Sequence, residues 1–468
     1  MLRKRIIYFL LVILIVPFVY SLFSKSYDKS NLNGDFYPAQ DVKFLYDLSY
    51  KLNGKIKRRQ VIFDEQLKMI DDSEEFILID LFLFNDEYDK DKMSFKNQVS
   101  LMTDKLIKKK KENPNIDIVF ITDEINNFYG AYTEDNIKRL KENGIDVTIT
   151  DPNMIRDSNP TYSGFYKFYL NWMGSPEGGS IQNIFAPKGP KVSVRSFLKL
   201  LNFKANHRKV MVTEKCGLVS SSNPHDPSSN HSNVAVKFYG KAMEDLIQSE
   251  LALVNNTHPT IENFKVRDFE DKDIYLRAIS EKAIYRALKD NVDKASAGDV
   301  INIGIFYIAD KKLLKDLSSA SNRGVKINIV ADLNKDAFGL EKNGCPNRPA
   351  LSELVDKNQN INVRWYKTHG EQYHSKFAYF NYKNEKPRII LGSANFTRRN
   401  LQNYNLETDV EVVFNKNSDI YKELDNYYKN IWNNVDGEYT LPFEQYYEDS
   451  IFLRTLWKIQ ESTGLCTW

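Results

Sequence analysis

Two short groups of polar residues, far apart in the chain, have the composition of a site that handles phosphate. Each group begins with a histidine and a lysine two residues apart and continues, after an apolar stretch, with a serine and an asparagine two residues apart. The groups are His207, Lys209, Ser221 and Asn223 in the first copy, and His374, Lys376, Ser393 and Asn395 in the second. The chain has six histidines, so two of them in matching contexts indicate a repeated functional motif.

Both groups lie on predicted β-strands. The apolar runs 210–212 and 377–380 are typical of buried strands, and side chains two residues apart on a strand point to the same face. Each group therefore presents an imidazole, an ammonium, a hydroxyl and a carboxamide on one surface. If the two surfaces meet, a phosphate contacts two lysines and two histidines, which predicts phosphoryl chemistry without a metal.

The paired imidazoles predict covalent catalysis. One imidazole attacks phosphorus and forms a phosphohistidine, while the other, protonated, donates a proton to the leaving alkoxide. The lysines neutralise the phosphodiester, and the asparagines and serines add oriented hydrogen bonds to the substrate. Water as the second acceptor gives hydrolysis of the phosphodiester, whereas an alcohol gives transfer of the phosphoryl-linked group to a new hydroxyl.

This doubled pattern resembles the phospholipase D superfamily, whose HKD motif, H-x-K followed by G-S-x-N, occurs twice in monomeric members. The sequence Asn-His-Arg-Lys around His207 looks most like that of bacterial cardiolipin synthases and related membrane phosphatidyltransferases. The resemblance implies a phospholipid substrate, no cofactor, and a monomer whose active site lies between two halves. It implies His207 as nucleophile and His374 as general acid, with the reverse assignment open. It also implies that Glu407 orients His374, and that Ser221 and Ser393 bind substrate.

The chain departs from the family pattern at three positions. The family's Asp, five residues after the Lys, is Glu214 in the first copy and Asn381 in the second, and the Gly of the first G-S-x-N is Ser220. Because the acidic residue of the family supports the catalytic groups and does not react itself, we expect catalytic activity to survive its replacement here. The first copy has no carboxylate at the position equivalent to Glu407, and Asp226 is the only nearby acid for its histidine.

A metal site near the first motif is the weaker interpretation of a small polar cluster. His225, Asp226 and His231 lie close together in the sequence. Because no further ligand follows with regular spacing, we interpret these residues as a polar loop beside the active site. The sequence therefore predicts that no metal is bound.

Length and composition are those of a globular chain of two domains. Its 468 residues are 42% hydrophobic and 13% aromatic, enough to fill two ordinary cores. The net charge of +3 gives no general case for nucleic-acid binding, although it leaves room for a local basic patch. The three cysteines, Cys216, Cys345 and Cys466, have neither metal-ligand spacing nor a disulfide pattern.

The N-terminus predicts a membrane segment. Arg3-Lys4-Arg5 precedes an apolar run from Ile6 to Phe23 that is interrupted by Pro17. Positive charge before an apolar run favours an N-in orientation, which puts the rest of the chain on the extracytoplasmic side. The run is short for a spanning helix, and Val19-Tyr20-Ser21 also fits a signal-peptidase site. We therefore expect a single-pass anchor in the cell membrane, with secretion after signal-peptide cleavage as the alternative.

The remainder predicts two similar α/β halves related by a pseudo-dyad. Predicted strands alternate with predicted helices in each half, which favours mostly parallel sheets covered on both faces. The predicted strands are 76–82, 116–122, 145–150, 300–307, 325–331 and 361–366, and the predicted helices are 97–112, 134–143, 311–322 and 351–356.

Four segments follow from this organisation. They are a membrane segment and linker at 1–34, a first phospholipase D-like domain at 35–258, a second at 259–435, and a tail at 436–468. The first domain carries an aromatic-rich insert at about 152–204 that has no counterpart in the second. Its rings and lysines suit a membrane interface or an acyl-chain groove, or else a helical cap whose rings pack internally.

Three functions fit these observations. The first is an exported, membrane-associated phospholipid phosphodiesterase or phosphatidyltransferase, favoured by both motifs, the apolar N-terminus and the insert. The second is a surface or secreted nuclease of the same superfamily, which the balanced charge disfavours without removing. The third is a catalytically silent phosphate-binding protein, against which the two intact His–Lys pairs argue.

Overall fold

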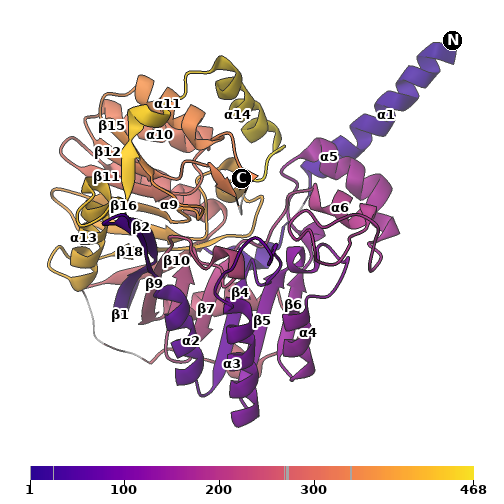
Figure 1. Cartoon of the computed structure of the whole chain (residues 1–468), viewed down its shortest axis with the longest axis horizontal. Helices are drawn as coiled ribbons and strands as arrows, with labels where there is room; N and C mark the ends of the chain where they lie inside the picture. Colours follow the sequence, from indigo (N-terminus) through magenta and orange to yellow (C-terminus); the bar gives the residue numbers. More distant parts are fainter. Residues whose placement is uncertain (1, 25, 268, 270–272, 338–339) are drawn as a thin grey trace.

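The structure, a computed structural model, describes residues 2–24, 26–267, 269, 273–337 and 340–468. A 15-stranded sheet runs through the body of the molecule, helices cover its faces, and helix α1 (Leu2–Leu22) projects away from it (Figure 1). The fold is therefore mixed α/β.

The N-terminal half of the sheet has the strand order β1-β9-β8-β7-β4-β5-β6. These strands are β1 (Tyr37–Tyr46), β4 (Phe76–Leu81), β5 (Asp117–Asp123), β6 (Asp146–Thr150), β7 (Lys209–Thr213), β8 (Gly217–Ser220) and β9 (Val234–Gly240). A separate hairpin joins β2 (Leu48–Leu52) and β3 (Lys55–Arg59). All six residues of β4 are buried, because helices pack on both of its faces.

The C-terminal half repeats this order as β10-β18-β17-β16-β11-β12-β15, with β19 (Thr440–Pro442) added at the outer edge. Its strands are β10 (Tyr275–Ser280), β11 (Val300–Ile305), β12 (Lys326–Ala331), β15 (Ile361–Tyr366), β16 (Lys376–Asn381), β17 (Arg388–Gly392) and β18 (Thr408–Val413). A short two-stranded hairpin, β13 (Asp336–Ala337) with β14 (Leu340–Glu341), follows β12. The two halves join where Tyr37 and Pro38 of β1 pair antiparallel with β10.

The expectation of mostly parallel sheets is wrong. Four strand pairs of the large sheet are parallel, namely β4–β5, β5–β6, β11–β12 and β12–β15, and its other pairs are antiparallel. The helix-separated strands are the parallel ones, as predicted from their crossovers. The strands that carry the motifs, β7 and β16, instead turn back through short loops into β8 and β17, and β9 and β18 pair antiparallel with β8 and β17 after longer connections. The pseudo-dyad stays a prediction.

Amphipathic helices cover the sheet and bury their apolar faces on it. The first half has α2 (Ile62–Asp72), α3 (Gln98–Glu112), α4 (Asp135–Glu142), α7 (Ala242–Leu251) and α8 (Pro259–Glu262). The second half has α9 (Lys282–Lys294), α10 (Lys311–Asn322), α11 (Asn347–Asp356), α12 (Arg398–Leu401), α13 (Asp419–Asn433) and α14 (Ile451–Thr463). One core cluster contains Phe44 and Val236 of the first half together with Phe377 and Tyr427 of the second. The predicted boundary at 258/259 stays a prediction.

The insert forms a small helical unit at one end of the sheet. It contains α5 (Pro160–Phe165), a π-helical turn (Tyr166–Leu170), a 3-10 turn (Asn171–Met173) and α6 (Val194–Leu200). Helix α5 packs against α1 (Figure 1). Of the described helices, α1 is long and apolar enough to cross a membrane, a property that it shares with signal sequences.

Candidate active site

The two His–Lys pairs occupy equivalent places at the start of equivalent strands. His207 lies two residues before the first residue of β7, Lys209, and His374 lies two residues before the first residue of β16, Lys376. All four side chains are buried, with 8% and 7% of the two histidines exposed. Strand alternation turns the histidine and lysine of each pair to the same side.

Backbone pairing between the halves brings the two motifs together. The amide of His207 donates to the carbonyl of Leu406 at 2.8 Å, and the amide of Leu406 donates to the carbonyl of Ala205 at 3.0 Å. In the reciprocal place, the amide of Ser232 donates to the carbonyl of Gln372 at 3.0 Å. The segment that leads into each histidine therefore runs beside the segment that follows the other motif.

Because the two halves pair in this way, Glu407 contacts the other histidine and not the predicted one. The Glu407 carboxylate lies 2.9 Å from Nδ1 of His207, so the expectation that it orients His374 is wrong. Nδ1 of His374 lies instead 3.2 Å from Oδ1 of Asn233. Asp226 does not serve His207 either, because its carboxylate accepts the amide of Val99 at the start of α3. Sequence proximity failed here because each orienting residue belongs to the other half.

The hydrogen bonds on Nδ1 define the reactive nitrogen of each ring. Glu407 and Asn233 both present an oxygen, so each neutral imidazole carries its proton on Nδ1 and keeps a lone pair on Nε2. In each half the Nε2 atom is therefore the ring nitrogen that is available to attack a substrate or, when protonated, to donate a proton.

The serines of the two motifs hold the residues that orient the histidines. Ser393 Oγ donates to the Glu407 carboxylate, and Ser221 Oγ donates to Asn233 Oδ1 at 3.3 Å. Asn400 Nδ2 also donates to Glu407. In this structure the two serine hydroxyls are thus used for positioning, although we predicted contact with substrate.

The two asparagines differ in their surroundings. Asn223 Oδ1 accepts the amide of Leu83 at 3.3 Å, which ties the first motif to the loop after β4. Asn395 is buried, and among the described residues its Oδ1 has no hydrogen-bond partner. A buried amide oxygen that lacks a protein partner is a group that a ligand or water satisfies.

Two phenylalanines that sequence reasoning missed shape the site. The ring of Phe82 lies 4.8 Å from the ring of His207, and Lys209 Nζ lies 5.0 Å from the Phe82 centroid. Phe306 repeats both contacts at 5.0 Å and 5.2 Å with the second pair. Each is the first residue after a buried strand, β4 or β11, and this shared position was the available signal.

Burial and repulsion between neighbouring cations favour the uncharged forms of the two histidines and the two lysines. Burial lowers the pKa of both histidines well below the usual range, and the nearby lysine ammonium groups lower it further. Burial lowers the pKa of Lys209 to about 7 and that of Lys376 well below its usual value, the latter also through repulsion from Lys209. An anion bound among these groups would raise their pKa values and favour their charged forms.

Burial acts in the opposite direction on the carboxylate that orients the first histidine. It raises the pKa of Glu407 to about 7, while the Lys209 ammonium, Ser393, Asn400 and Lys376 oppose the increase. The charge of Glu407 is therefore sensitive to pH near neutrality.

Buried aspartates fix the approach of each motif strand. Asp123 accepts the backbone amide of Asn206 at 2.7 Å, and Asp332 accepts that of Tyr373 at 2.7 Å. These amides belong to the residues before the two histidines, so both aspartates position the catalytic rings. Burial raises the pKa of each aspartate to about 7.

Arg208, between the first histidine and lysine, points to the other side of β7. Its guanidinium is buried and pairs with Glu281 at 2.7 Å and Glu250 at 3.3 Å. Glu281 also accepts the amide of Glu407 at 3.2 Å. An ionic network behind the site therefore ties the first motif to the second half.

Neither departure at the family's acidic position adds a group to the site. Glu214 accepts the amide of Glu74 at 2.8 Å, beyond the far end of β7, and Asn381 ends β16. Within the described part of the chain, no three His, Cys, Asp or Glu side chains gather closely enough to hold a metal ion. His225, of the weaker metal interpretation, bonds to Ser228 through Nδ1 at 2.8 Å. The metal-independent mechanism stays a prediction.

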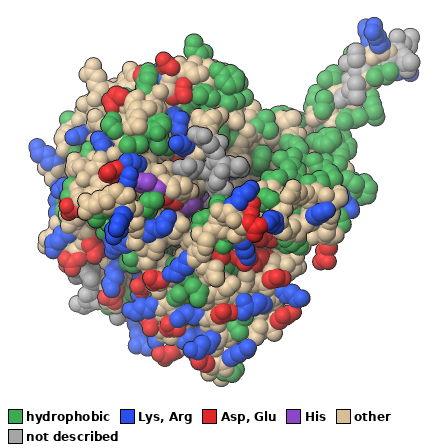
Figure 2. Space-filling view, in the orientation of Figure 1, with side chains coloured by type: hydrophobic (Ala, Val, Ile, Leu, Met, Phe, Trp, Pro, Cys, Tyr) green, Lys and Arg blue, Asp and Glu red, His purple; other side chains and the backbone are tan. Residues whose placement is uncertain are grey.

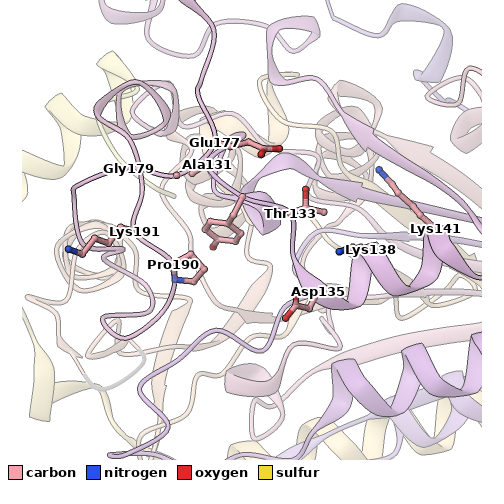
Figure 3. A pocket seen from close by; sticks show the side chains of 11 residues that line it. Ala131, Thr133, Asp135, Lys138, Lys141, Glu177, Gly179, Pro190 and Lys191 are labelled. Atoms are coloured by element: carbon pink, nitrogen blue, oxygen red, sulfur yellow. The ribbon is translucent and has the colours of Figure 1, made fainter.

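A separate open depression of about 710 Å³ lies between α4 and the insert (Figure 3). Lys138, Lys141 and Lys191 line it together with Asp135 and Glu177. It contains no side chain of the two motifs, and its charges are mixed, so it is distinct from the His–Lys site.

Residues 288–432, which include the whole second motif and Glu407, match the family model described as "Cardiolipin synthase, PLD-like domain". This match confirms the predicted resemblance to the phospholipase D superfamily over the second half of the chain. No curated protein sequence matches the chain.

Three solved structures resemble the chain at low sequence identity, and one of them, with a TM-score above 0.5, supports the fold. Phosphatidylserine synthase from Haemophilus influenzae Rd KW20 matches with a TM-score of 0.58 and 10% identity, over 92% of this chain and 95% of that one. Polyphosphate kinase from Porphyromonas gingivalis matches with a TM-score of 0.46 and 12% identity, over 90% and 53% of the two chains. NucT from Helicobacter pylori matches with a TM-score of 0.27 and 14% identity, over 34% and 97%.

Proposed function

We propose that this chain is a membrane-associated phospholipid phosphatidyltransferase or phosphodiesterase that works through a covalent phosphohistidine. One observation carries the proposal. Two buried His–Lys pairs face one site, and each histidine is held through Nδ1 so that its Nε2 is free to react. The family of the second half, whose description names cardiolipin synthase, supports a lipid phosphodiester as substrate.

The surroundings of the two rings support His207 as the nucleophile. In the first step His207 Nε2 forms a bond to phosphorus, the bond from phosphorus to the leaving oxygen breaks, and protonated His374 gives its Nε2 proton to that oxygen. Attack leaves a positive charge on the His207 ring, which the Glu407 carboxylate at 2.9 Å stabilises. His374 faces the neutral Asn233 amide and releases its proton more readily.

The lysines and the asparagine amides stabilise charge on the phosphoryl oxygens. Lys209 and Lys376 each donate to the carbonyl of their own histidine, the latter at 2.7 Å, which holds both ammonium groups beside the rings. In the second step His374 accepts a proton from water or an alcohol, whose oxygen bonds to phosphorus while the bond to His207 breaks. Water yields phosphatidic acid, and a lipid alcohol yields a new phosphatidyl ester.

The location that we propose follows from α1. Its N-terminal basic residues favour a catalytic body on the extracytoplasmic side of the cell membrane, and secretion after cleavage is the alternative. We also propose that the two halves are related by a pseudo-dyad, which the repeated strand order supports.

The full chain, mixed with phosphatidylglycerol liposomes and followed by lipid mass spectrometry, tests the proposal. We expect phosphatidic acid or a new phosphatidyl ester, and we expect His374→Ala to abolish either product. His258→Ala is the matched control, because this buried histidine bonds to Asp117 and Asp146 away from the site and its loss affects stability alone. Unchanged lipids with a folded, intact chain would overturn the lipid substrate and make nucleic-acid phosphodiesters the next substrates to assay.

A further inference from the structure

We propose that residues 160–173 of the insert are embedded in the membrane leaflet that faces the catalytic body, packed beside α1. The bilayer itself is thus the partner of this surface. The inference deepens the proposed function, since it states how the catalytic body meets a lipid substrate.

A proline in α1 leaves one helix carbonyl without its helical hydrogen bond, and the insert supplies a donor to that carbonyl. Pro17 has no amide hydrogen, so the carbonyl of Ile13, four residues earlier, lacks its helical donor. Tyr169 Oη donates to this carbonyl at 3.1 Å. Gly164 of α5 approaches so closely that a Cβ there would lie 2.2 Å from the Pro17 carbonyl oxygen. Satisfying such a carbonyl matters most where no water can reach it, as in hydrocarbon.

The position of these contacts along α1 determines how deep the insert lies. Ser21 Oγ donates to the buried Asp157 at 2.6 Å, which marks the polar end of the contact. Ile13 lies eight residues, or about 12 Å, further along the helix axis. If the insert stayed outside the bilayer, only residues 3–12, about 15 Å of helix, would remain for a hydrocarbon core of about 30 Å. A membrane-crossing α1 therefore takes the insert into the bilayer with it.

The outer face of the embedded segment is apolar. Phe165, Phe168 and Trp172 are 41%, 46% and 78% exposed. Hydrophobic side chains form a continuous surface from α1 onto the adjoining body (Figure 2). A contiguous exposed patch of this kind marks an interaction site, and its continuity with a membrane helix identifies the bilayer as the partner.

Three polar side chains of this segment bond within the protein, whereas the buried Ser163 Oγ has no partner among the described residues. Tyr162 Oη donates to the carbonyl of Leu198 at 2.7 Å, and Trp172 Nε1 donates to that of Tyr169 at 2.8 Å. Lys167 pairs with the buried Asp157 at 2.9 Å. Burial in hydrocarbon is costly for unpaired polar groups, and these three pairings lower that cost for the segment.

The embedded segment connects directly to the catalytic centre. Lys204, three residues before His207, is buried and pairs with Asp157, the same residue that binds α1 through Ser21. Lys204 Nζ also donates to the carbonyl of Ile155 at 2.9 Å. The contact with the membrane is thus joined rigidly to the first motif, which sets the site at a constant height above the leaflet.

Single introduced cysteines test the inference on the full chain. The native cysteines Cys216, Cys345 and Cys466 are buried, so a fluorescent maleimide labels Phe168→Cys and, as control, Leu101→Cys selectively. Leu101 is 44% exposed on α3, at the end of the molecule away from α1 (Figure 1). After reconstitution in phosphatidylglycerol liposomes, we expect doxyl-labelled phospholipids to quench the probe at position 168 several-fold and to leave the probe at 101 unchanged.

Equal quenching at the two positions would overturn the inference. A probe at 168 that is shielded from aqueous quenchers but not quenched by doxyl lipid would also overturn it, because a second protein copy would then cover the surface. The lipid-turnover assay is independent of this result. Quenching at 168 without turnover refutes the proposed function alone, and turnover without quenching refutes the embedded segment alone.

Discussion

Replacing Glu407 with glutamine tests the roles assigned to the two histidines. Glutamine keeps the size of the side chain and an oxygen for Nδ1 of His207, but it removes the negative charge 2.9 Å from that ring. If His207 is the nucleophile, the charge stabilises the cationic ring of the intermediate. Two unit charges about 4 Å apart interact by about 4 kcal/mol at an effective dielectric constant of about 20, which corresponds to about a 10³-fold loss of kcat.

The equivalent change on the other ring is Asn233→Ala. It removes a neutral hydrogen bond of 3.2 Å to His374, for which about 1 kcal/mol and a loss of about fivefold to tenfold are expected. Single-turnover assays on phosphatidylglycerol, with detection of the phosphohistidine after a denaturing quench at neutral pH, measure both variants, and thermal unfolding checks that each remains folded. A Glu407→Gln variant within tenfold of the native rate, or an Asn233→Ala variant that is the more damaged, would refute the assignment.

Three further predictions follow from the same geometry. The pH profile of kcat/KM should be bell-shaped around pH 7, because Glu407 loses its charge below its pKa of about 7 and Lys209 loses its charge above a pKa of about 7. Glu407→Gln should flatten the acid limb of the profile, and an unchanged acid limb would contradict the role of Glu407. Arg208→Met should lower the free energy of unfolding in urea by about 3–5 kcal/mol, since it leaves Glu250 and Glu281 buried without their cation, and a loss below about 1 kcal/mol would show that the pairs are unimportant. Chelation by EDTA should leave the rate unchanged, and a strong loss that zinc or calcium restores would establish a metal requirement.

Much of the fold was predictable where the signal was local. The strands at 76–81, 300–305 and 361–366 and helix α10 lie where their apolar runs and periodicity predicted them. The relative direction of neighbouring strands was predictable where a helix separates them in the sequence, because a helical crossover joins parallel strands. The strands that begin at Lys209 and Lys376 have no helix before the next strand, and they pair antiparallel with it.

The sequence by itself determined which groups form the candidate site, since a histidine and a lysine two residues apart in an extended segment share a face wherever that segment lies. It also determined that they occur twice. Only the tertiary structure decided which residue orients which ring. Glu407 and Asn233 lie in the half opposite to the histidine that they serve, and Phe82 and Phe306 reach the site from strands distant in the sequence. Such contacts depend on how two halves meet, and residue spacing along one chain carries no information about that.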